Sequence, residues 1–367
     1  MEKIINDTEK IKRLNEVWKY SIKNFKIYKE IADKKSIYTI NRLEDWDKIS
    51  FLDKHKYNKY KNLIFEELKD LKGYIKSTQT GGSSSSPTEF PLYPIDGKYI
   101  KKGLYKLRSK AGMNYINTNY IHVWGHSHLI NRYGTKAIFI KLKDSLKRII
   151  KNEIQICGYN PTKHVKRFIN AIKSGKYKWI IGYTSAIYYL ARYIDENGIN
   201  LKGYIDYVVL TSETITLYSI EMIEKVFDCV VIKEYGSAEL GVVAYSSIES
   251  KKYFFDTDNY YIEKHLVKNS NNEYRKLLFT TFNRVFPLIK YCPDDYFSDF
   301  LIKNNHDIIC SDVIGRHLDS ILYLSLKENK LSGQYTEIFI VHCLKTIKSI
   351  AQTTCYVNNA RILKKIR

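Results

Sequence analysis

Three short apolar runs, separated by segments with the apolar spacing of helices, constrain the fold of this 367-residue chain most strongly. The runs are Tyr177–Ile181, Tyr207–Leu210 and Cys229–Lys233, and each has the length of a buried strand. Strands that alternate with helices predict a mostly parallel sheet with helices packed on its faces. Ligands of such sheets bind beyond the carboxyl ends of the strands, so the residues that follow these runs are candidates for a site.

We expect the first run to end in a turn at Gly182, after which Thr184 or Ser185 caps a helix. The second run leads into Thr211-Ser212-Glu213-Thr214, and the third leads directly into Tyr235. Apolar residues recur at helical spacing in both intervening segments: Ile187, Leu190, Ala191 and Ile194 in one, and Leu217, Ile220, Ile223, Val226 and Phe227 in the other.

The chain before and after this region has a different pattern. Apolar spacing predicts helices from about Thr8 to Lys72, and Gly, Ser and Pro predict a loop from Ser77 to Pro94. The later elements that we expect are strands over Leu277–Thr281 and Leu288–Tyr291 around a turn at Asn283-Arg284, a hairpin from Ile321–Leu326 that turns at Glu328-Asn329, a helix over Thr336–Ile350 and a strand over Thr353–Val357. The predicted class is α/β: a large N-terminal domain of mostly parallel sheets with flanking helices, residues 1–315, and a small, shortened α+β C-terminal domain, residues 316–367.

The composition is typical of a globular intracellular protein. No apolar run reaches the length of a membrane span, and the first residues do not resemble a signal peptide. The six cysteines are scattered without a C-x-x-C pair, which is typical of reduced thiols. We therefore expect a cytoplasmic protein without integral membrane association.

The formal net charge of +21 would by itself allow a nucleic-acid-binding protein, whose retention of DNA or RNA would weaken with salt. The lysines are spread along the chain without a dense basic block, however, and the richness in Lys, Ile, Asn and Tyr is typical of an AT-rich genome. We favour this second interpretation and expect no nucleic-acid partner.

The segment Thr80-Gly81-Gly82-Ser83-Ser84-Ser85-Ser86-Pro87 has the composition of a phosphate-binding loop. Backbone N–H groups reach an anion where no bulky side chain intervenes, and hydroxyl groups add donors. Thr80, Ser83 and Ser84 are candidate catalytic residues that hold phosphates, and Gly82 is a candidate nucleotide-binding residue. Taken alone, the segment would favour a flexible linker, because most Gly/Ser runs are linkers.

The segment Tyr235-Gly236-Ser237-Ala238-Glu239 offers the groups that bind a nucleotide base and a metal ion. The ring of Tyr235 can stack on adenine, Gly236 lets the backbone approach the base, and Ser237 lies beside them. The carboxylate of Glu239 can hold Mg²⁺, which takes one or two carboxylates together with substrate phosphates. The alternative is a turn between a strand and a helix with an incidental acid.

Asp295 ends the segment that begins at Phe286. A carboxylate there can accept hydrogen bonds from both ribose hydroxyls of a nucleotide. Lys290 adds a positive charge for the cofactor, and Asp294 could alter the turn or compete for the metal. The alternative is a surface turn after a buried strand.

In this order the segments resemble the motifs of the adenylate-forming ligases, and more narrowly the branch of phenylacetate–CoA ligase and the CapK-like capsule biosynthesis proteins. The patterns are T-S-G-S-T-G-x-P for the loop, Y-G-x-T-E for Tyr235–Glu239, P-L-I-R-Y-x-x-G-D for Pro287–Asp295 and the hinge G-R-x-x-D for Gly315–Asp319. The hinge arginine contacts the ribose in that family, and Arg316 is its match here. Ile181–Ala186 and Leu210–Thr214 are also similar to segments of this branch.

The resemblance implies an enzyme that uses ATP and Mg²⁺ to activate a carboxylic acid to an acyl-adenylate, with release of pyrophosphate. The acyl group would then pass to CoA or to an amine, by analogy in capsular or other surface polysaccharide biosynthesis. The chain departs from the family at Ser85, Lys290 and Asp294, which replace Gly, Arg and Gly, and it has a shortened C-terminal domain without an identified catalytic lysine. These departures leave open a catalytically impaired nucleotide-binding member that serves as a scaffold in a polysaccharide biosynthesis complex.

The one histidine cluster comprises His122, His126 and His128 around Trp124. It lacks a Cys or carboxylate partner at a recognisable metal-ligand spacing. We favour packing, or a role of Trp124 and His126 in an acyl pocket, over zinc binding.

Overall fold

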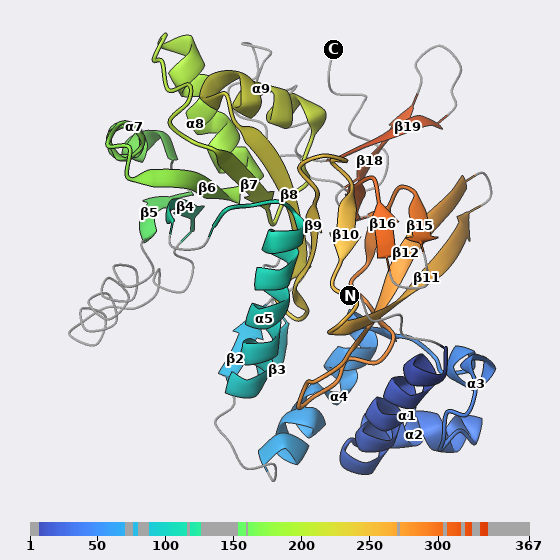
Figure 1. The fold of residues 1–367 in the computed structure, drawn as a ribbon. Coiled ribbons are helices and arrows are strands. Elements are labelled where there is room, and N and C mark those ends of the chain that lie inside the picture. Colours follow the sequence, from blue (N-terminus) through green and yellow to red (C-terminus); the bar gives the residue numbers. More distant parts are fainter. Residues whose placement is uncertain are drawn as a thin grey trace. The chain divides into compact units, whose positions relative to one another are not determined.

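The structure, a computed structural model, describes residues 7–69, 76–79, 88–115, 118–125, 153–158, 161–269, 272–303, 307–316, 320–324 and 331–336. The chain forms two compact units, Met1–His317 and Leu318–Arg367. The first unit holds two large sheets and the helices that Figure 1 labels. The described part of the second unit is the antiparallel pair of β18 (Ser320–Leu324) and β19 (Leu331–Thr336), which confirms the predicted pairing, while the turn predicted at Glu328-Asn329 lies outside the described residues. The helix predicted over Thr336–Ile350 and the strand over Thr353–Val357 lie outside the described residues.

A nine-stranded sheet with the order β15-β16-β10-β9-β8-β7-β6-β4-β5 forms the centre of the first unit. The five strands from β8 to β5 pair in parallel, which confirms the predicted α/β class, and the other four pair antiparallel. The strands are β4 (Asn119–Trp124), β5 (Glu153–Cys157), β6 (Tyr177–Tyr183), β7 (Tyr207–Thr211), β8 (Val230–Ser237), β9 (Gly241–Ser246), β10 (Tyr253–Phe255), β15 (Phe300–Lys303) and β16 (Asp307–Cys310).

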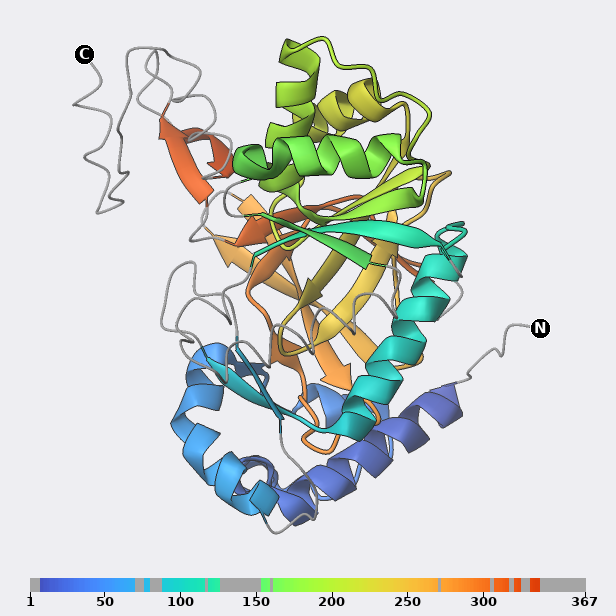
Figure 2. The ribbon, with the colours of Figure 1, turned by 90° about the vertical axis from the view of Figure 1, so that its left-hand side faces the viewer.

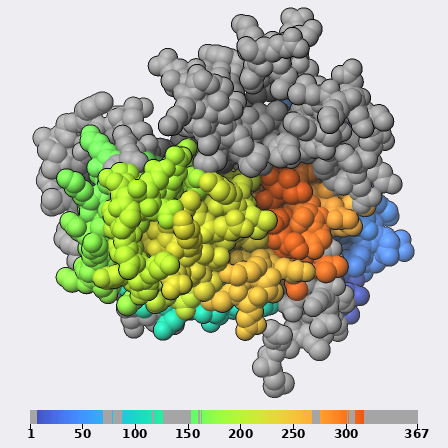
Figure 3. Space-filling model, turned by 90° about the horizontal axis from the view of Figure 1, so that it is seen from above, coloured from blue at the N-terminus to red at the C-terminus, as the bar shows by residue number. Residues whose placement is uncertain are grey.

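Helices cover both faces of the parallel strands. The apolar sides of α7 (Val165–Lys173), α8 (Thr184–Glu196) and α9 (Leu217–Phe227) pack with β4, β6 and β7 in one core cluster, and a short 3₁₀ helix, Pro161–His164, precedes α7. The end of α5 (Pro94–Lys110) packs on the opposite face against Trp179 and Val209. Seen from above, the atoms of one face run from green through yellow to orange, so the yellow atoms separate the green α7–α8 region from the orange strands (Figure 3). The predicted apolar face of α9 is confirmed except for Leu217, which is exposed.

Two details at the start of α8 differ from the prediction. Gly182 lies inside β6 rather than in a turn. A glycine is needed there because a Cβ would overlap the backbone of Val123 on the neighbouring strand β4. Neither Thr184 nor Ser185 is the N-cap, since the helix already begins at Thr184. Instead the carboxylate of Glu213 accepts hydrogen bonds from Ser185 N at 2.7 Å and from Ser185 Oγ at 3.0 Å. The cap therefore comes from the next loop of the chain, which local sequence does not reveal.

The second sheet has six strands in the order β1-β13-β12-β14-β17, with β11 paired to β12, and is antiparallel except for β1 with β13. The predicted turn at Asn283-Arg284 is confirmed, and Asn283 has a left-handed φ of 58°. Of the strand predicted over Leu288–Tyr291, only Tyr291 is in a strand, although Thr281 N still donates to Leu288 O at 2.9 Å. The strands are β1 (Leu52–Asp53), β11 (Tyr260–Asn269), β12 (Asn272–Thr281), β13 (Tyr291–Cys292), β14 (Asp295–Phe297) and β17 (Val313–Arg316).

The predicted N-terminal helices are confirmed as α1 (Asp7–Asn24), α2 (Lys26–Lys35), α3 (Leu43–Asp47) and α4 (Lys54–Lys69). Both ribbon views show them, in blue, at the end of the unit away from α7–α9 (Figures 1 and 2). Trp18, Tyr28 and Trp46 are fully buried in the core that these helices share with the second sheet. No helix in the part of the chain that the structure describes is both long and apolar enough to cross a membrane.

The region predicted as a loop from Ser77 to Pro94 contains an antiparallel hairpin, β2 (Lys76–Gln79) with β3 (Glu89–Leu92), and α5 begins at Pro94. The prediction was wrong for these two strands because a Gly/Ser-rich centre masks the short pairing segments on either side. Gln79 pairs with Glu89, so the stem closes directly beside the segment from Thr80 to Pro87, which itself lies outside the described residues.

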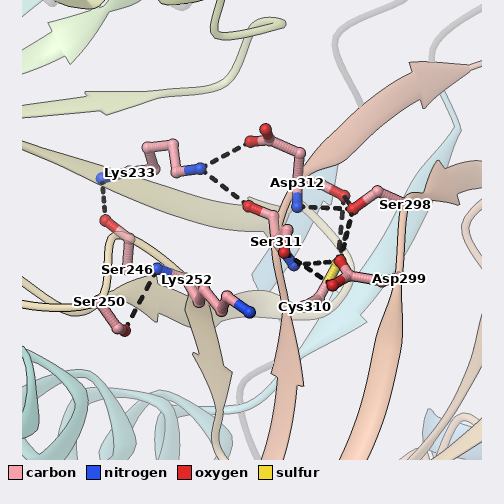
Figure 4. A network of polar contacts seen from close by, with 9 residues as sticks. All are labelled: Lys233, Ser246, Ser250, Lys252, Ser298, Asp299, Cys310, Ser311 and Asp312. Atoms are coloured by element: carbon pink, nitrogen blue, oxygen red, sulfur yellow. Dashed lines mark hydrogen bonds and ion pairs between the residues drawn. The ribbon is translucent and has the colours of Figure 1, made fainter.

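A network of serines and carboxylates holds the turns on either side of β15 and β16 (Figure 4). Ser311 donates through its backbone N and its Oγ, each at 2.8 Å, to the two carboxylate oxygens of Asp299, and Ser298 Oγ donates to Asp299 Oδ1 at 2.9 Å. Burial opposes ionisation of Asp299, but these hydrogen bonds outweigh it and lower the pKa of the carboxyl group to about 2.

We expect this lowered pKa to appear as a pH-dependent stability difference between the wild type and Asp299→Asn. A carboxyl group with a depressed folded-state pKa stabilises the fold above its unfolded pKa, near 4, and loses that contribution as the pH falls to about 2. The effect should be small because Asp299 is partly exposed. Urea unfolding of both proteins between pH 2 and pH 6 checks it, and a difference that does not change with pH would contradict it.

Candidate nucleotide-binding site

The predicted nucleotide segment Tyr235–Glu239 forms a β-hairpin between β8 and β9, so the alternative of a strand-to-helix turn is wrong. The register shifts between Tyr235 and Gly236, and a Cβ on Gly236 would overlap the carbonyl oxygen of Gly241. Ser237 Oγ accepts a hydrogen bond from Leu240 N at 3.3 Å. Gly236 and Ser237 thus shape the hairpin, whatever they contribute to a ligand.

The hairpin contacts the second sheet through Tyr235 and Asp295, two of the predicted site residues. Tyr235 Oη donates a hydrogen bond to Asp295 Oδ2 at 2.7 Å, and both side chains are buried. The ring of Tyr235 also meets Phe297 edge to face, with centroids 5.3 Å apart. The candidate adenine and ribose residues are therefore direct neighbours, although 60 positions separate them in the sequence.

Glu239, in the turn of the same hairpin, makes a second contact with that sheet. Tyr291 Oη donates to Glu239 Oε1 at 2.9 Å, and Glu239 is only 7% exposed. Its other oxygen, Oε2, is buried without a hydrogen-bond partner among the described residues. A buried carboxylate oxygen without a donor is costly, so such an atom in a folded protein calls for an explanation.

A divalent cation fits Glu239 Oε2. Mg²⁺ prefers hard oxygen ligands and completes its shell with water and substrate phosphates, so one protein carboxylate is sufficient. Within the described ranges, no group of three or more His, Cys, Asp or Glu side chains is placed to hold a metal ion. Tyr291 belongs to the predicted motif, but its role in orienting Glu239 was not predicted.

The stem of the Gly/Ser segment packs against Tyr291, the hydrogen-bond partner of Glu239. Phe90 of β3 lies edge to face against Tyr291, with centroids 5.9 Å apart, and Tyr57 of α4 stacks on Phe90 at 4.1 Å. Thr80, Gly82, Ser83 and Ser84 lie outside the described residues, but the strands that flank them lead to the partner of the candidate metal ligand.

Lys290 has a different environment from the one predicted. Its Nζ lies 3.1 Å from Glu263 Oε1 and donates to Trp46 O at 3.2 Å, and the side chain is buried. Burial raises the pKa of Glu263, while the Lys290 ammonium group opposes that rise. This ion pair favours a structural role for Lys290 over the predicted cofactor contact.

Asp294, at the position of the family's glycine, adopts the left-handed conformation that a glycine would take, with φ of 70°. Its carboxylate forms an ion pair with Lys276. Burial alone would lower the pKa of Lys276, but the hydrogen bond and the charge of Asp294 raise it. The predicted change in the turn is therefore small, and the carboxylate is bound to Lys276.

We expect Asp294→Gly to be more stable than Asp294→Ala by about 1 kcal/mol. Both variants lose the ion pair with Lys276. Glycine adopts a left-handed φ without steric cost, whereas alanine must place its Cβ in that conformation and tolerates it less well than aspartate does. Urea unfolding of the two variants measures the difference. Equal stabilities would show that the turn relaxes to another conformation.

Arg316 pairs with Asp295 through the backbone, as part of the antiparallel pairing of β14 with β17. The preceding residue, Gly315, has φ of 103°, and a Cβ on it would lie 3.1 Å from Thr214 Oγ1. The predicted hinge segment thus starts beside both the candidate ribose carboxylate and the Thr211–Thr214 loop.

A buried polar chain that the sequence did not reveal supports the base of the hairpin. Thr211 Oγ1 donates to Glu234 Oε1 at 2.8 Å, Tyr245 Oη donates to Glu234 Oε2, and Arg108 Nε donates to Tyr245 Oη at 3.0 Å. The guanidinium group of Arg108 also lies over the ring of Trp179, 5.0 Å from its centroid. Glu234 directly precedes Tyr235, so this chain fixes the strand that carries the candidate adenine residue.

The histidine cluster is described only in part, because His126 and His128 lie outside the described residues. His122 Nδ1 lies 2.9 Å from Glu153 Oε1, and Trp124 stacks on Tyr183 with centroids 4.3 Å apart. His122 therefore has the carboxylate partner that sequence spacing did not show, contributed by the neighbouring strand β5. The stacking of Trp124 on Tyr183 is a packing contact of the kind expected for this residue.

Comparison with known proteins places the fold. No family model matches the chain. Protein CapK of Staphylococcus aureus is 26% identical over 241 residues, which cover 62% of this chain and 49% of CapK, so the match spans about half of that relative. Among solved structures, 2-hydroxyisobutyryl-CoA ligase in the postadenylation state in complex with R3-HIB-AMP superposes with a TM-score of 0.68 at 13% identity, over 95% of this chain and 74% of the ligase. The complex of that ligase with 2-HIB-AMP and CoA in the thioesterification state also superposes with a TM-score of 0.68. The sequences are 14% identical, and the match covers 88% of this chain and 70% of the ligase.

Proposed function

Because this chain has the fold of the adenylate-forming ligases and is similar in sequence to a CapK protein, we propose that it activates a carboxylic acid with ATP. The observation that supports this most directly is the pair of hydrogen bonds between one hairpin and the second sheet, from Tyr235 to Asp295 and from Tyr291 to Glu239. Three residues predicted to bind adenine, ribose and metal thereby gather at one place, and one of them keeps a buried oxygen without a described partner.

In the proposed reaction, a carboxylate oxygen of the substrate attacks the α-phosphorus of ATP. The new P–O bond forms as the bond to pyrophosphate breaks, which gives an acyl-adenylate. Tyr235 would stack on the adenine, and Asp295 with Arg316 would hold the ribose. Thr80, Ser83 and Ser84 would donate hydrogen bonds to the phosphates, near Gly82, and Glu239 would hold Mg²⁺. Mg²⁺, when bound, neutralises negative charge on the phosphates.

The second half of the proposed function transfers the acyl group to CoA or to an amine, and AMP leaves. The CoA complex of the ligase with this fold supports a thiol acceptor. A role in capsular or surface polysaccharide biosynthesis is part of the proposal through the similarity to CapK.

ATP–pyrophosphate exchange across a panel of aryl, fatty, amino and sugar acids tests this proposal. Exchange that depends on one class of acid and is lost in Glu239→Gln would support adenylation and identify that class. Calorimetry with ATP accompanies the assay. Binding of ATP without exchange for any acid would instead favour the nucleotide-binding scaffold.

A further inference from the structure

Lys233 is a buried lysine that the proposed reaction does not use. It lies on β8 two residues before Tyr235, and its side chain is only 9% exposed. Lysine is almost never fully buried unless it is paired, because removing its charge from water is costly. What Lys233 binds therefore shows what it does.

The ammonium group of Lys233 binds the turn that precedes β17 (Figure 4). Its Nζ lies 2.6 Å from Asp312 Oδ1 and donates to Ser311 O at 3.0 Å, and it lies over the ring of Tyr253, 4.8 Å from the centroid. Lys233 N also donates to Ser246 Oγ at 2.8 Å, which fixes the base of the side chain. Lys233 thus joins the nine-stranded sheet to the start of β17 in the six-stranded sheet.

The same two sheets are joined at Tyr235 and Asp295, and β17 connects the two contacts. From Asp312, β17 runs to Arg316, whose backbone pairs with Asp295. On the other side, Lys233 and Tyr235 are separated by about 7 Å of strand. The strand segment of β8 joins Lys233 to Tyr235, and β17 with its backbone pairing joins Asp312 to Asp295. These links form a closed ring, so each of the two side-chain contacts limits the movement of the other.

The far side of the ring is held independently of Lys233. Asp312 N donates to Ser298 Oγ at 2.8 Å, and Ser298 N donates to Asp312 O at 3.0 Å. Asp312 is thereby fixed to the end of β14, which begins at Asp295. Removal of the lysine would therefore leave the turn folded but release its link to β8.

We propose that Lys233 is a positioning residue of the nucleotide site: through Asp312 and β17 it sets the distance between Tyr235 and the Asp295–Arg316 pair. This inference rests on the proposed function for its effect on nucleotide binding. Lys233 itself touches no substrate in this assignment, because its ammonium group is bound to Asp312 and Ser311.

Lys233→Met tests the proposal in the full chain, since Met has a similar length and no charge. Asp312 is 53% exposed and can be solvated when its partner is removed. We expect the dissociation constant of ATP, measured by calorimetry, to rise about tenfold, within the range for loss of a supporting contact in a binding site. We also expect faster amide hydrogen exchange at Val313–Arg316 in the protein without nucleotide.

Glu263→Gln is the matched control, because it disturbs another buried lysine ion pair that is separate from this ring. It should lower the free energy of unfolding but leave the ATP dissociation constant within about twofold of the wild type. If Lys233→Met does not fold, Asp312→Asn, at a half-exposed position, gives the same comparison.

The proposal would be overturned if Lys233→Met bound ATP as tightly as the wild type does. It would also be overturned if the amide hydrogen exchange of β17 did not change. Wild-type protein that binds no ATP would count against the proposed function instead. In that case amide hydrogen exchange alone decides whether Lys233 fixes β17.

Discussion

Glu239→Gln is expected to lower the rate of ATP–pyrophosphate exchange by about a hundredfold or more. Gln keeps the size of the side chain and an acceptor for Tyr291 Oη, but it has no negative charge for Mg²⁺. Loss of one preorganised electrostatic group at a reacting phosphate typically has an effect of this size. The rate is measured at saturating Mg²⁺ and ATP, with the acid that gives the fastest exchange.

The stability of Glu239→Gln distinguishes a metal ligand from a structural acid. Because Oε2 is buried and has no hydrogen-bond partner among the described residues, removal of its charge should leave the free energy of unfolding unchanged or raise it. Tyr291→Phe is the companion variant, since it removes the donor to Oε1 and should lower stability. A clear loss of stability in Glu239→Gln without a loss of exchange would assign Glu239 to the fold.

The second large effect is expected at Asp295. Asp295→Ala removes the candidate ribose acceptor and also leaves Tyr235 Oη without this acceptor. We expect the dissociation constant of ATP to rise by about ten- to a hundredfold, because hydrogen bonds to a charged group contribute about 1.5–3 kcal/mol. Isothermal titration calorimetry with ATP measures this.

Tyr235→Phe is the control for Asp295, because it removes the same hydrogen bond but retains both the ring and the carboxylate. It should weaken ATP binding less than Asp295→Ala does. Equal losses in the two variants would mean that the hydrogen bond, and not a contact of the carboxylate with the nucleotide, is what matters.

Local sequence was sufficient for the parallel half of the main sheet. The runs at β6, β7 and β8 are apolar on both faces because helices cover both sides of the sheet. Such continuous apolar runs can be recognised in the sequence as buried strands. The β2–β3 hairpin was missed, because each strand has four residues and the pairing is a property of both. The turn at Gly182 was predicted from a residue preference, whereas the glycine is needed where two strands approach closely.

Candidate site residues could be named from the sequence where the chemistry of a side chain and a family pattern pointed to the same use. Glu239 and Asp295 were candidates because of what a carboxylate can bind and because of the family patterns that they match, and the structure places each beside a tyrosine. The partners of Lys290 and Lys233 were not predictable, because Glu263 and Asp312 are distant or unremarkable in sequence. A charge in a motif can bind a ligand or stabilise the fold, and only the tertiary contacts distinguish the two.

The packing of Phe90 against Tyr291 couples the stem of the Gly/Ser segment to Glu239. The Gly/Ser segment is carried by a stem whose aromatic residue touches the tyrosine that orients Glu239. Any displacement of that stem must be accommodated at Tyr291, since both rings are buried. A displacement of the stem and a reorientation of Glu239 are therefore mechanically linked through these two rings, so the two would occur together rather than in sequence.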